Sequence, residues 1–229
     1  MDQLTLDLIE HMSKCVTENR LALFKQVLAL RTRYIKVLLE DIYQSQNASA
    51  VLRTCDCTGI QDVHIVEENN EYEINRDVAL GSDQWLSLNY YHEGEHNIVR
   101  AIKSLKKEGY RIVATSPHKD GATPDNFDLQ KGKAALMFGT ELNGLSDRAL
   151  RLADEYIQIP MSGFTESYNI SVSAAITLYT LRQRLELSSL PWKMGEDEQN
   201  ELLLNWLRTT IKMSDQIENK FIKDYHSDF

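Results

Sequence analysis

The stretch AALMFGTELNGLS, residues 134–146, decides the fold class. Its first five residues form a short apolar run, which is typical of a strand buried on both faces of a parallel sheet. Gly139 and Gly144 then bracket Glu141, and Ser146 stands where a residue would cap a following helix. Outward from this stretch, the same order of strand, turn and helix recurs along the chain.

Strand-like runs and helical segments alternate over the middle of the chain. Apolar runs predict six strands, at residues 34–39, 62–66, 86–91, 111–115, 134–138 and 156–159. Amphipathic periodicity predicts helices at residues 46–58, 95–108, 146–153 and 167–186. This alternation predicts an α/β fold with a mostly parallel sheet and helices on both faces.

Helical segments flank this α/β region on both sides. The sequence indicates a helical N-terminal arm at residues 1–33, a core at 34–190 and a helical C-terminal arm at 191–229. Each arm is too short to bury a core of its own. We therefore expect the arms to pack on the core or on another subunit.

Composition bounds the class of protein. The chain has 229 residues, a net charge of −9 and three cysteines, an odd number without the spacing of a disulfide framework. The acidic balance argues weakly against a nucleic-acid partner, although binding uses local patches rather than net charge. No apolar run approaches the roughly 20 residues that span a bilayer. These features predict a soluble, cytoplasmic protein with reduced thiols.

Common nucleotide and hydrolase motifs are missing, but three other segments are unusual. The chain has no G-x-G-x-x-G or G-x-x-x-x-G-K-[ST] loop and no G-x-S-x-G elbow. The unusual segments are NASAVLRT at 47–54, FGTELNGLS at 138–146 and IPMSG followed by ESYNISV at 159–163 and 166–172. Each alone is explained by turns and helix caps. Each also follows a predicted strand, where sites on α/β sheets gather.

Taken together and in this order, the three segments resemble the motifs of the SpoU (TrmH) branch of the SPOUT RNA 2'-O-ribose methyltransferases. The resemblance covers roughly residues 34–186. Tyr168 and Ile170 stand where leucine and valine are usual. The resemblance implies S-adenosyl-L-methionine as cofactor, a C-terminal trefoil knot that strand patterns alone would not suggest, and a homodimer with the cofactor site at or near the subunit interface.

The same resemblance implies the residues of the site. The catalytic set would be Arg53, Asn47, Glu141, Ser167 and Asn169. The cofactor would be held by Thr115, Gly139, Ile159, Met161, Gly163 and Tyr168, largely through backbone groups, and no metal is implied. Two roles for Arg53 stay open. It would act as a base if RNA and neighbouring groups perturb it, or it would stay charged and hold the substrate, because arginine is hard to deprotonate.

A local run of basic residues suggests where RNA would bind. Between Asn19 and Leu39 there are five basic residues and no acidic one: Arg20, Lys25, Arg31, Arg33 and Lys36. Such a stripe suits phosphate contact, and an ordinary solvated helix face explains it equally well. Short helical extensions resemble those of tRNA (guanosine-18-2'-O)-methyltransferases. The alternatives are the same reaction on rRNA or another tRNA ribose, a catalytically silent RNA-binding module, and a small-molecule or protein methyltransferase.

Overall fold

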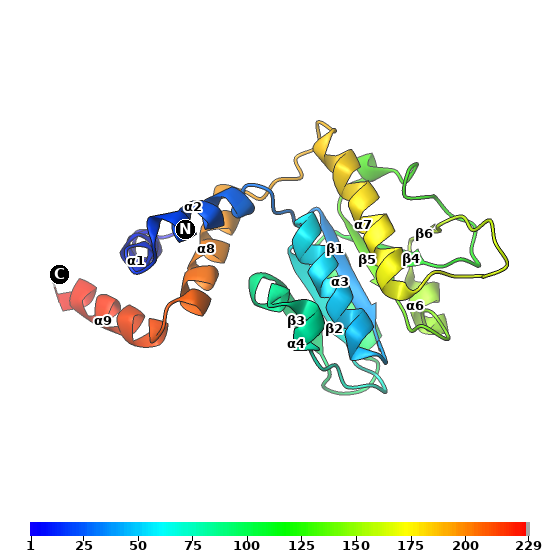
Figure 1. Cartoon of the computed structure of the whole chain (residues 1–229), viewed down its shortest axis with the longest axis horizontal. Helices are drawn as coiled ribbons and strands as arrows, with labels where there is room; N and C mark the ends of the chain where they lie inside the picture. Colours follow the sequence, from blue (N-terminus) through cyan, green and yellow to red (C-terminus); the bar gives the residue numbers. More distant parts are fainter. Residues whose placement is uncertain (228–229) are drawn as a thin grey trace. The chain divides into compact units, whose positions relative to one another are not determined.

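The computed structural model describes residues 1–227, and it describes side chains up to residue 225 (Figure 1). The chain divides into two compact units. One unit is continuous, from Thr32 to Trp192, and the other joins Met1–Arg31 to the segment that begins at Lys193. Each unit is described by itself below.

The continuous unit is built on one sheet. Its strands are β1 (Ile35–Glu40), β2 (Asp62–Val66), β3 (Ser87–Tyr91), β4 (Arg111–Thr115), β5 (Ala134–Phe138) and β6 (Glu155–Ile157). They lie in the order β3-β2-β1-β5-β4-β6, and every neighbouring pair is parallel. The six strands and the parallel sheet that the sequence predicted are therefore confirmed. The trefoil knot stays a prediction.

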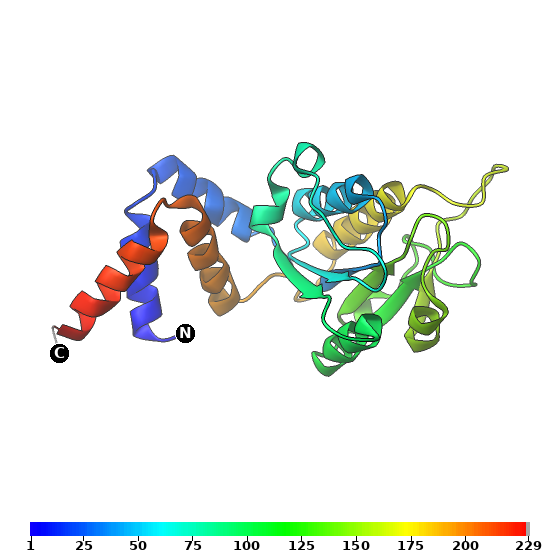
Figure 2. The same ribbon diagram turned by 90° about the horizontal axis from the view of Figure 1, so that it is seen from below.

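Helices cover both faces of this sheet, as Figure 2 shows from below. The helices of the unit are α3 (Ser45–Thr58), α4 (Arg76–Ala79), α5 (Asn97–Lys107), α6 (Asp147–Leu152) and α7 (Ile170–Glu186). Val37 and Leu39 of β1 pack into the core beneath α3 and α7, whereas Leu38 joins the core beneath α5 and α6. Alternate side chains of one strand thus fill two apolar layers, which explains why the strands read as continuous apolar runs.

The sequence missed three short helical segments of this unit. They are α4, η1 (Ser82–Trp85) and η2 (Leu129–Lys131). A single turn of three or four residues leaves no amphipathic periodicity to read. The longer helices lie where the periodicity predicted them, with α5 and α7 starting two or three residues later than expected.

The second unit is made only of helices within the described residues. These are α1 (Gln3–Ser13), α2 (Glu18–Leu28), α8 (Glu196–Thr210) and α9 (Ser214–Ser227). Phe24 of α2 lies edge-on to Trp206 of α8 with ring centroids 5.5 Å apart, and His11 of α1 lies 4.8 Å from Phe221 of α9. The two arms, which the sequence analysis treated as separate extensions, thus bury their apolar faces against each other.

The basic stripe expected along residues 20–36 needs a correction. Arg31 is only 2% exposed, and its guanidinium lies 5.4 Å from the Trp206 ring. Arg33 pairs with Asp62 at 3.3 Å, and the buried Lys36 ammonium lies 2.7 Å from Glu108. These three cations contact partners inside the protein, and their long aliphatic stems can pack against apolar surface. They do not form an exposed stripe. Only Arg20 and Lys25 of the five are exposed.

Candidate active site

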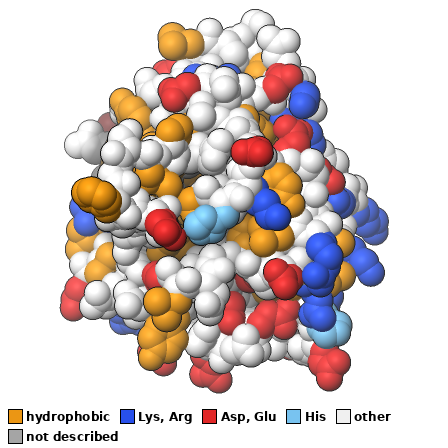
Figure 3. Space-filling view, turned by 90° about the vertical axis from the view of Figure 1, so that its right-hand side faces the viewer, with side chains coloured by type: hydrophobic (Ala, Val, Ile, Leu, Met, Phe, Trp, Pro, Cys, Tyr) orange, Lys and Arg blue, Asp and Glu red, His pale blue; other side chains and the backbone are white. Residues whose placement is uncertain are grey.

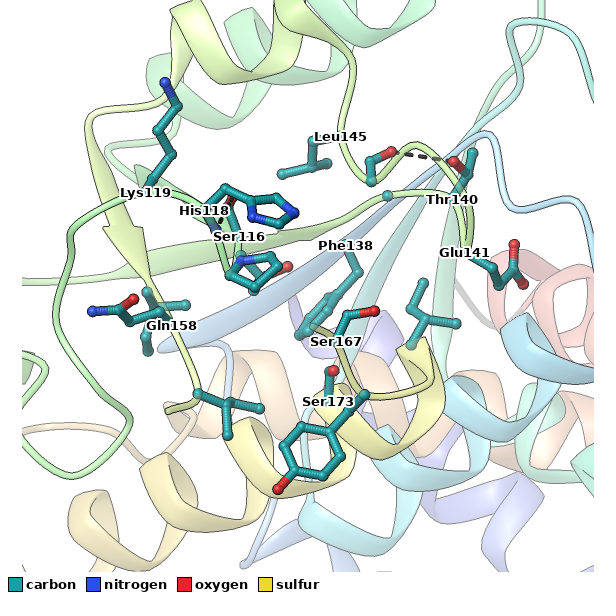
Figure 4. Close-up of a pocket in the computed structure, with 18 of the residues that line it drawn as sticks. Ser116, His118, Lys119, Phe138, Thr140, Glu141, Leu145, Gln158, Ser167 and Ser173 are labelled. Atoms are coloured by element: carbon teal, nitrogen blue, oxygen red, sulfur yellow. Dashed lines mark hydrogen bonds between the residues drawn. The ribbon is translucent and has the colours of Figure 1, made fainter. Parts of the chain in front are cut away.

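A cavity of about 260 Å³ lies at the carboxyl ends of β4, β5 and β6 (Figure 4). Thr115 ends β4, Phe138 ends β5, and Ile159 and Met161 follow β6, and all four line the cavity. Parallel strands present their carboxyl ends at one edge, so residues far apart in sequence meet there. The cavity lining combines apolar side chains with hydroxyls and backbone groups.

The loop after β5 forms one wall and requires its first glycine. A Cβ at Gly139 would lie 2.2 Å from the carbonyl carbon and oxygen of Gly144. These are backbone atoms, so no change of side-chain rotamer could remove the clash. Thr140 and Gly144 exchange backbone hydrogen bonds of 2.9 and 3.0 Å across the turn. Gly144 has a φ of 65°, which favours glycine. The two bracketing glycines therefore build a closed, tight loop.

A second wall comes from the segment after β4, which the sequence analysis did not select. The backbone N–H groups of Ser116 and Ala122 donate to Ile157 and Tyr156 of the β6 strand, each at 3.1 Å. A Cβ at Gly121 would lie 2.4 Å from the Tyr156 carbonyl oxygen, so only glycine permits this approach. Figure 4 shows His118 and Lys119 of this segment beside the cavity. The sequence could have indicated these two residues only through their position just after the predicted strand at residues 111–115.

The middle of the site holds a network of amides and a carboxylate. Asn47, at the start of α3, is 8% exposed. Its Nδ2 donates to Glu141 at 2.6 Å and to Gln44 at 3.0 Å. Its Oδ1 accepts from Asn169 Nδ2 at 3.2 Å. One residue from each of the three unusual segments therefore meets in a single network.

Asn169 also begins α7. Its Oδ1 accepts from the Ser171 N–H at 2.8 Å and from the Ser171 hydroxyl at 2.6 Å, so it caps the helix while its amide reaches Asn47. Ser167, two residues earlier, lines the cavity and points into it in Figure 4. Asn169 therefore caps the helix and also belongs to the network with Asn47.

Arg53 lies elsewhere on α3. It is exposed and lines a shallow hollow of about 620 Å³ between α3, α4 and α7, together with Cys57, Ile176 and Tyr179 among others. It is not among the residues that line the 260 Å³ cavity, and among the side chains of residues 1–225 it has no hydrogen-bond or ion-pair partner. Of the five expected catalytic residues, Glu141 and Ser167 line the cavity, Asn47 and Asn169 join Glu141 through hydrogen bonds, and Arg53 lies apart.

Five of the six residues expected to hold a cofactor line the cavity. They are Thr115, Gly139, Ile159, Met161 and Tyr168. Gly163 does not line it and is exposed in the loop before α7. The Thr115 hydroxyl is already engaged, because it donates to the Met137 carbonyl at 2.7 Å. The described residues contain no cluster of His, Cys, Asp and Glu that could bind a metal ion.

The family of the chain follows from a match that spans most of this unit. Residues 34–179 match the model of the SpoU rRNA Methylase family. The chain belongs to this family. The three segments that form the network and the cavity all lie inside the matched range, so the SpoU relationship extends over the whole candidate site.

Similar proteins cover most of the chain. A Borreliella burgdorferi protein named tRNA (guanosine(18)-2'-O)-methyltransferase is 45% identical over 219 residues, which cover 96% of this chain and 98% of that protein. A Thermus thermophilus protein of the same name is 34% identical over 84% of this chain and 97% of its own length. The crystal structure of an A. aeolicus TrmH/SpoU tRNA modifying enzyme matches with a TM-score of 0.73 and 30% identity, covering 85% of this chain and 98% of that one.

Proposed function

We propose that this SpoU protein transfers a methyl group from S-adenosyl-L-methionine to the ribose 2'-hydroxyl of guanosine-18 in tRNA. The observation that carries the proposal is the similarity, at 45% identity and over almost its whole length, to a protein named for this reaction. The presence of the whole expected catalytic set, Asn47, Arg53, Glu141, Ser167 and Asn169, supports it over a protein that only binds RNA, which would not need that set. We infer a cytoplasmic enzyme from this substrate. No helix within residues 1–227 is long and apolar enough to cross a membrane.

The cavity has the chemistry that this cofactor needs. Phe138, Leu145, Ile159 and Met161 would contact an adenine ring, and the tight turn at Gly139 would let the polar parts approach the backbone closely. A solved SpoU methyltransferase that is similar in fold was determined in complex with AdoMet. When bound, the cofactor supplies an electrophilic methyl group on a sulfonium. Thr115, Gly139, Ile159, Met161 and Tyr168 would hold it.

The residues of the chain then have to align and activate a poor nucleophile. Ser167 and Asn169, just before α7, would orient the ribose. Glu141 would hold Asn47 in place, and the same hydrogen bond would hold the loop of residues 139–145. Arg53 would bind the substrate phosphate and stabilise the oxygen as it loses its proton, or accept that proton itself. Alignment is the main contribution expected of the network, because its members are already hydrogen-bonded to one another.

The position of Arg53 supports a homodimer. Val172 and Tyr179 are exposed apolar residues of α7, with Tyr179 61% exposed beside Arg53, and the exposed Tyr168 lies just before the helix. Exposed apolar surface of this kind marks interfaces. We propose that a second copy covers this face and that the partner subunit's Arg53 completes the site of each chain. The exposed face of α7 and the incomplete set of catalytic residues in one chain then have a common explanation.

The proposed RNA substrate needs basic surface. Figure 3 shows Lys and Arg side chains along one side of the face that it draws. Exposed basic residues of α5 and α6 are Arg100, Lys103, Lys106, Lys107 and Arg151. Phosphate contacts by such residues are compatible with a net charge of −9, because binding depends on the local field.

One labelling experiment tests the function. The purified protein is incubated with radiolabelled S-adenosylmethionine and transcripts of tRNA and rRNA, and the methylated nucleotide is mapped. We expect label at the ribose of guanosine-18 in tRNA and none in a transcript whose position 18 carries 2'-deoxyguanosine. Label only in rRNA, in another nucleotide or in a protein would contradict the proposal, as would an absence of label in every RNA.

A further inference from the structure

Glu40, the last residue of the central strand β1, is a buried carboxylate for which the proposed reaction has no use. It is 3% exposed and lies one residue beyond Leu39, which pairs in register with Phe138 of β5. Glu40 therefore stands beside the point where the chain leaves β5 and enters the cavity loop. Buried carboxylates are rare unless something holds them in place.

Both carboxylate oxygens of Glu40 accept hydrogen bonds from one residue. The Ser146 N–H donates to Oε2 at 2.8 Å, and the Ser146 hydroxyl donates to Oε1 at 2.6 Å. The same hydroxyl oxygen accepts from the Ala149 N–H at 3.1 Å and caps α6. Ser146 is thus fixed in position and in hydroxyl orientation at the end of the loop that starts at Gly139.

The charge of Glu40 is unfavourable for stability. Burial raises the pKa of Glu40 above its ordinary value, and the nearby carboxylates of Glu68 and Asp41 raise it further, whereas the hydrogen bonds from Ser146 oppose the rise. An ionised group in such a place costs folding free energy that a neutral side chain would not. A carboxylate here therefore suggests a role other than stability.

We propose that Glu40 is a positioning residue of the methyl-donor site, which fixes Ser146 and thereby the wall formed by residues 139–145. The inference rests on the proposed function, in that the cavity is the site that binds S-adenosylmethionine. Leu145, the neighbour of Ser146, lines this cavity. The loop is then tied at its middle by Glu141 to Asn47 and at its end by Ser146 to Glu40.

The test uses Glu40→Gln in the full chain. The amide keeps one acceptor oxygen, but its NH₂ group then faces a Ser146 donor, so one of the two hydrogen bonds is lost. We expect the dissociation constant for S-adenosylmethionine, measured by calorimetry without RNA, to rise about 10-fold, the scale of one hydrogen bond to a charged group. The melting temperature should change little, because removal of the buried charge offsets the lost hydrogen bond.

Two further measurements separate positioning from general damage. Hydrogen exchange of the ligand-free protein should show faster exchange at Ser146 and Ala149 in Glu40→Gln, with β1 unchanged. Ser146→Ala should weaken cofactor binding to a similar degree, and adding Glu40→Gln to it should weaken binding little more, because both changes break the same contact.

Glu68→Gln is the matched control. It removes a charge near Glu40, but the Glu68 carboxylate accepts from the Ile98 N–H at the start of α5 and leaves the cavity loop alone. Its cofactor affinity should stay within about twofold of the unaltered protein, the scatter expected of distant sites. Unchanged affinity in Glu40→Gln, or an equal loss in Glu68→Gln, would overturn the inference. RNA plays no part in these measurements, so a failure to methylate tRNA would count only against the proposed function.

Discussion

Asn47 and Arg53 lie six residues apart on the same helix, α3, and their surroundings are opposite. Asn47 is buried and exchanges three hydrogen bonds with Gln44, Glu141 and Asn169. Arg53 is exposed, beside Tyr179, and within the described residues it has no hydrogen-bond partner. One chain therefore assembles the positioning half of the proposed site and leaves the charged half open to another molecule.

This difference indicates what each residue is available to do. A buried amide whose donors and acceptors are satisfied holds other groups in place. An exposed guanidinium keeps its five donors for a partner such as a phosphate or a second subunit. We therefore expect changes at Asn47 to affect structure and rate together, and changes at Arg53 to affect rate alone.

The largest effect is expected for Arg53→Ala. Its single-turnover rate of methyl transfer should fall at least ~100-fold, the scale of general-base or oxyanion-stabilising groups. The melting temperature and the affinity for S-adenosylmethionine should not change, because Arg53 does not line the cavity. Rapid-quench assays with labelled cofactor measure the rate, and calorimetry measures the affinity.

Arg53→Lys distinguishes the two possible roles of this arginine. Lysine keeps the charge but loses the planar fork of donors. A rate as low as that of the alanine variant would indicate bidentate positioning, and recovery of the rate as pH rises would indicate a base. A near-normal rate for Arg53→Ala would show that Arg53 is not part of the site.

The next largest effect concerns the face shared by Arg53 and Tyr179. Light scattering of the unaltered protein should give twice the chain mass of 26.4 kDa. Tyr179→Asp should weaken self-association by about 30-fold or more, as expected for a large aromatic anchor replaced by a charge. At low concentration this variant should be monomeric and inactive, yet fold normally by circular dichroism. An active monomer would contradict the proposal that the partner subunit's Arg53 completes the site.

Asn47→Ala should have a smaller and mixed effect. Removing this amide leaves the Glu141 carboxylate and the Asn169 amide without their partner, which should lower the free energy of unfolding by roughly 1–3 kcal/mol. The rate should fall about 10-fold, because the network orients groups and does not itself react. Denaturant titration and single-turnover kinetics measure the two losses. A loss of rate with unchanged stability would assign Asn47 a direct chemical role instead.

The sequence predicted the sheet and selected three residues that the structure brings together, but it did not predict the hydrogen bonds that join them. Strands such as Ala134–Phe138 carry their signal in their own residues, and the three motif segments led to Asn47, Glu141 and Asn169. The segment around Gly121 was missed, because its role depends on a backbone approach to Tyr156, 35 residues later, that no local pattern records.

The basic stripe failed for the same reason. A run of like charges in sequence gives no information on which cations are buried, and the partners of Arg31 and Lys36, Trp206 and Glu108, lie far along the chain. A solvated stripe and a set of buried cations are therefore indistinguishable in sequence. Only the fold separates them.

The smallest effects are expected for alanine substitutions of two cations in the N-terminal segment, the exposed Lys25 and the buried Arg31. Lys25→Ala should lower the slope of log affinity for tRNA against log salt by at most about 0.7–0.9 without changing the melting temperature. Arg31→Ala should instead lower the melting temperature, since the guanidinium packs on Trp206. Filter binding at several salt concentrations and thermal denaturation measure these outcomes. A reversed pattern would mean that Arg31 contacts RNA and Lys25 supports the fold.

The discontinuous helical unit has a consequence for how the protein is made. Helices α1 and α2 leave the ribosome first, but their partners α8 and α9 follow only after residues 32–192 have been synthesised. At common translation rates this interval lasts roughly 8–30 s. During it, Met12, Phe24 and Leu28, which end up buried, have no α8 or α9 to cover them. The apolar faces of α1 and α2 are therefore available to chaperones until α8 and α9 have been synthesised.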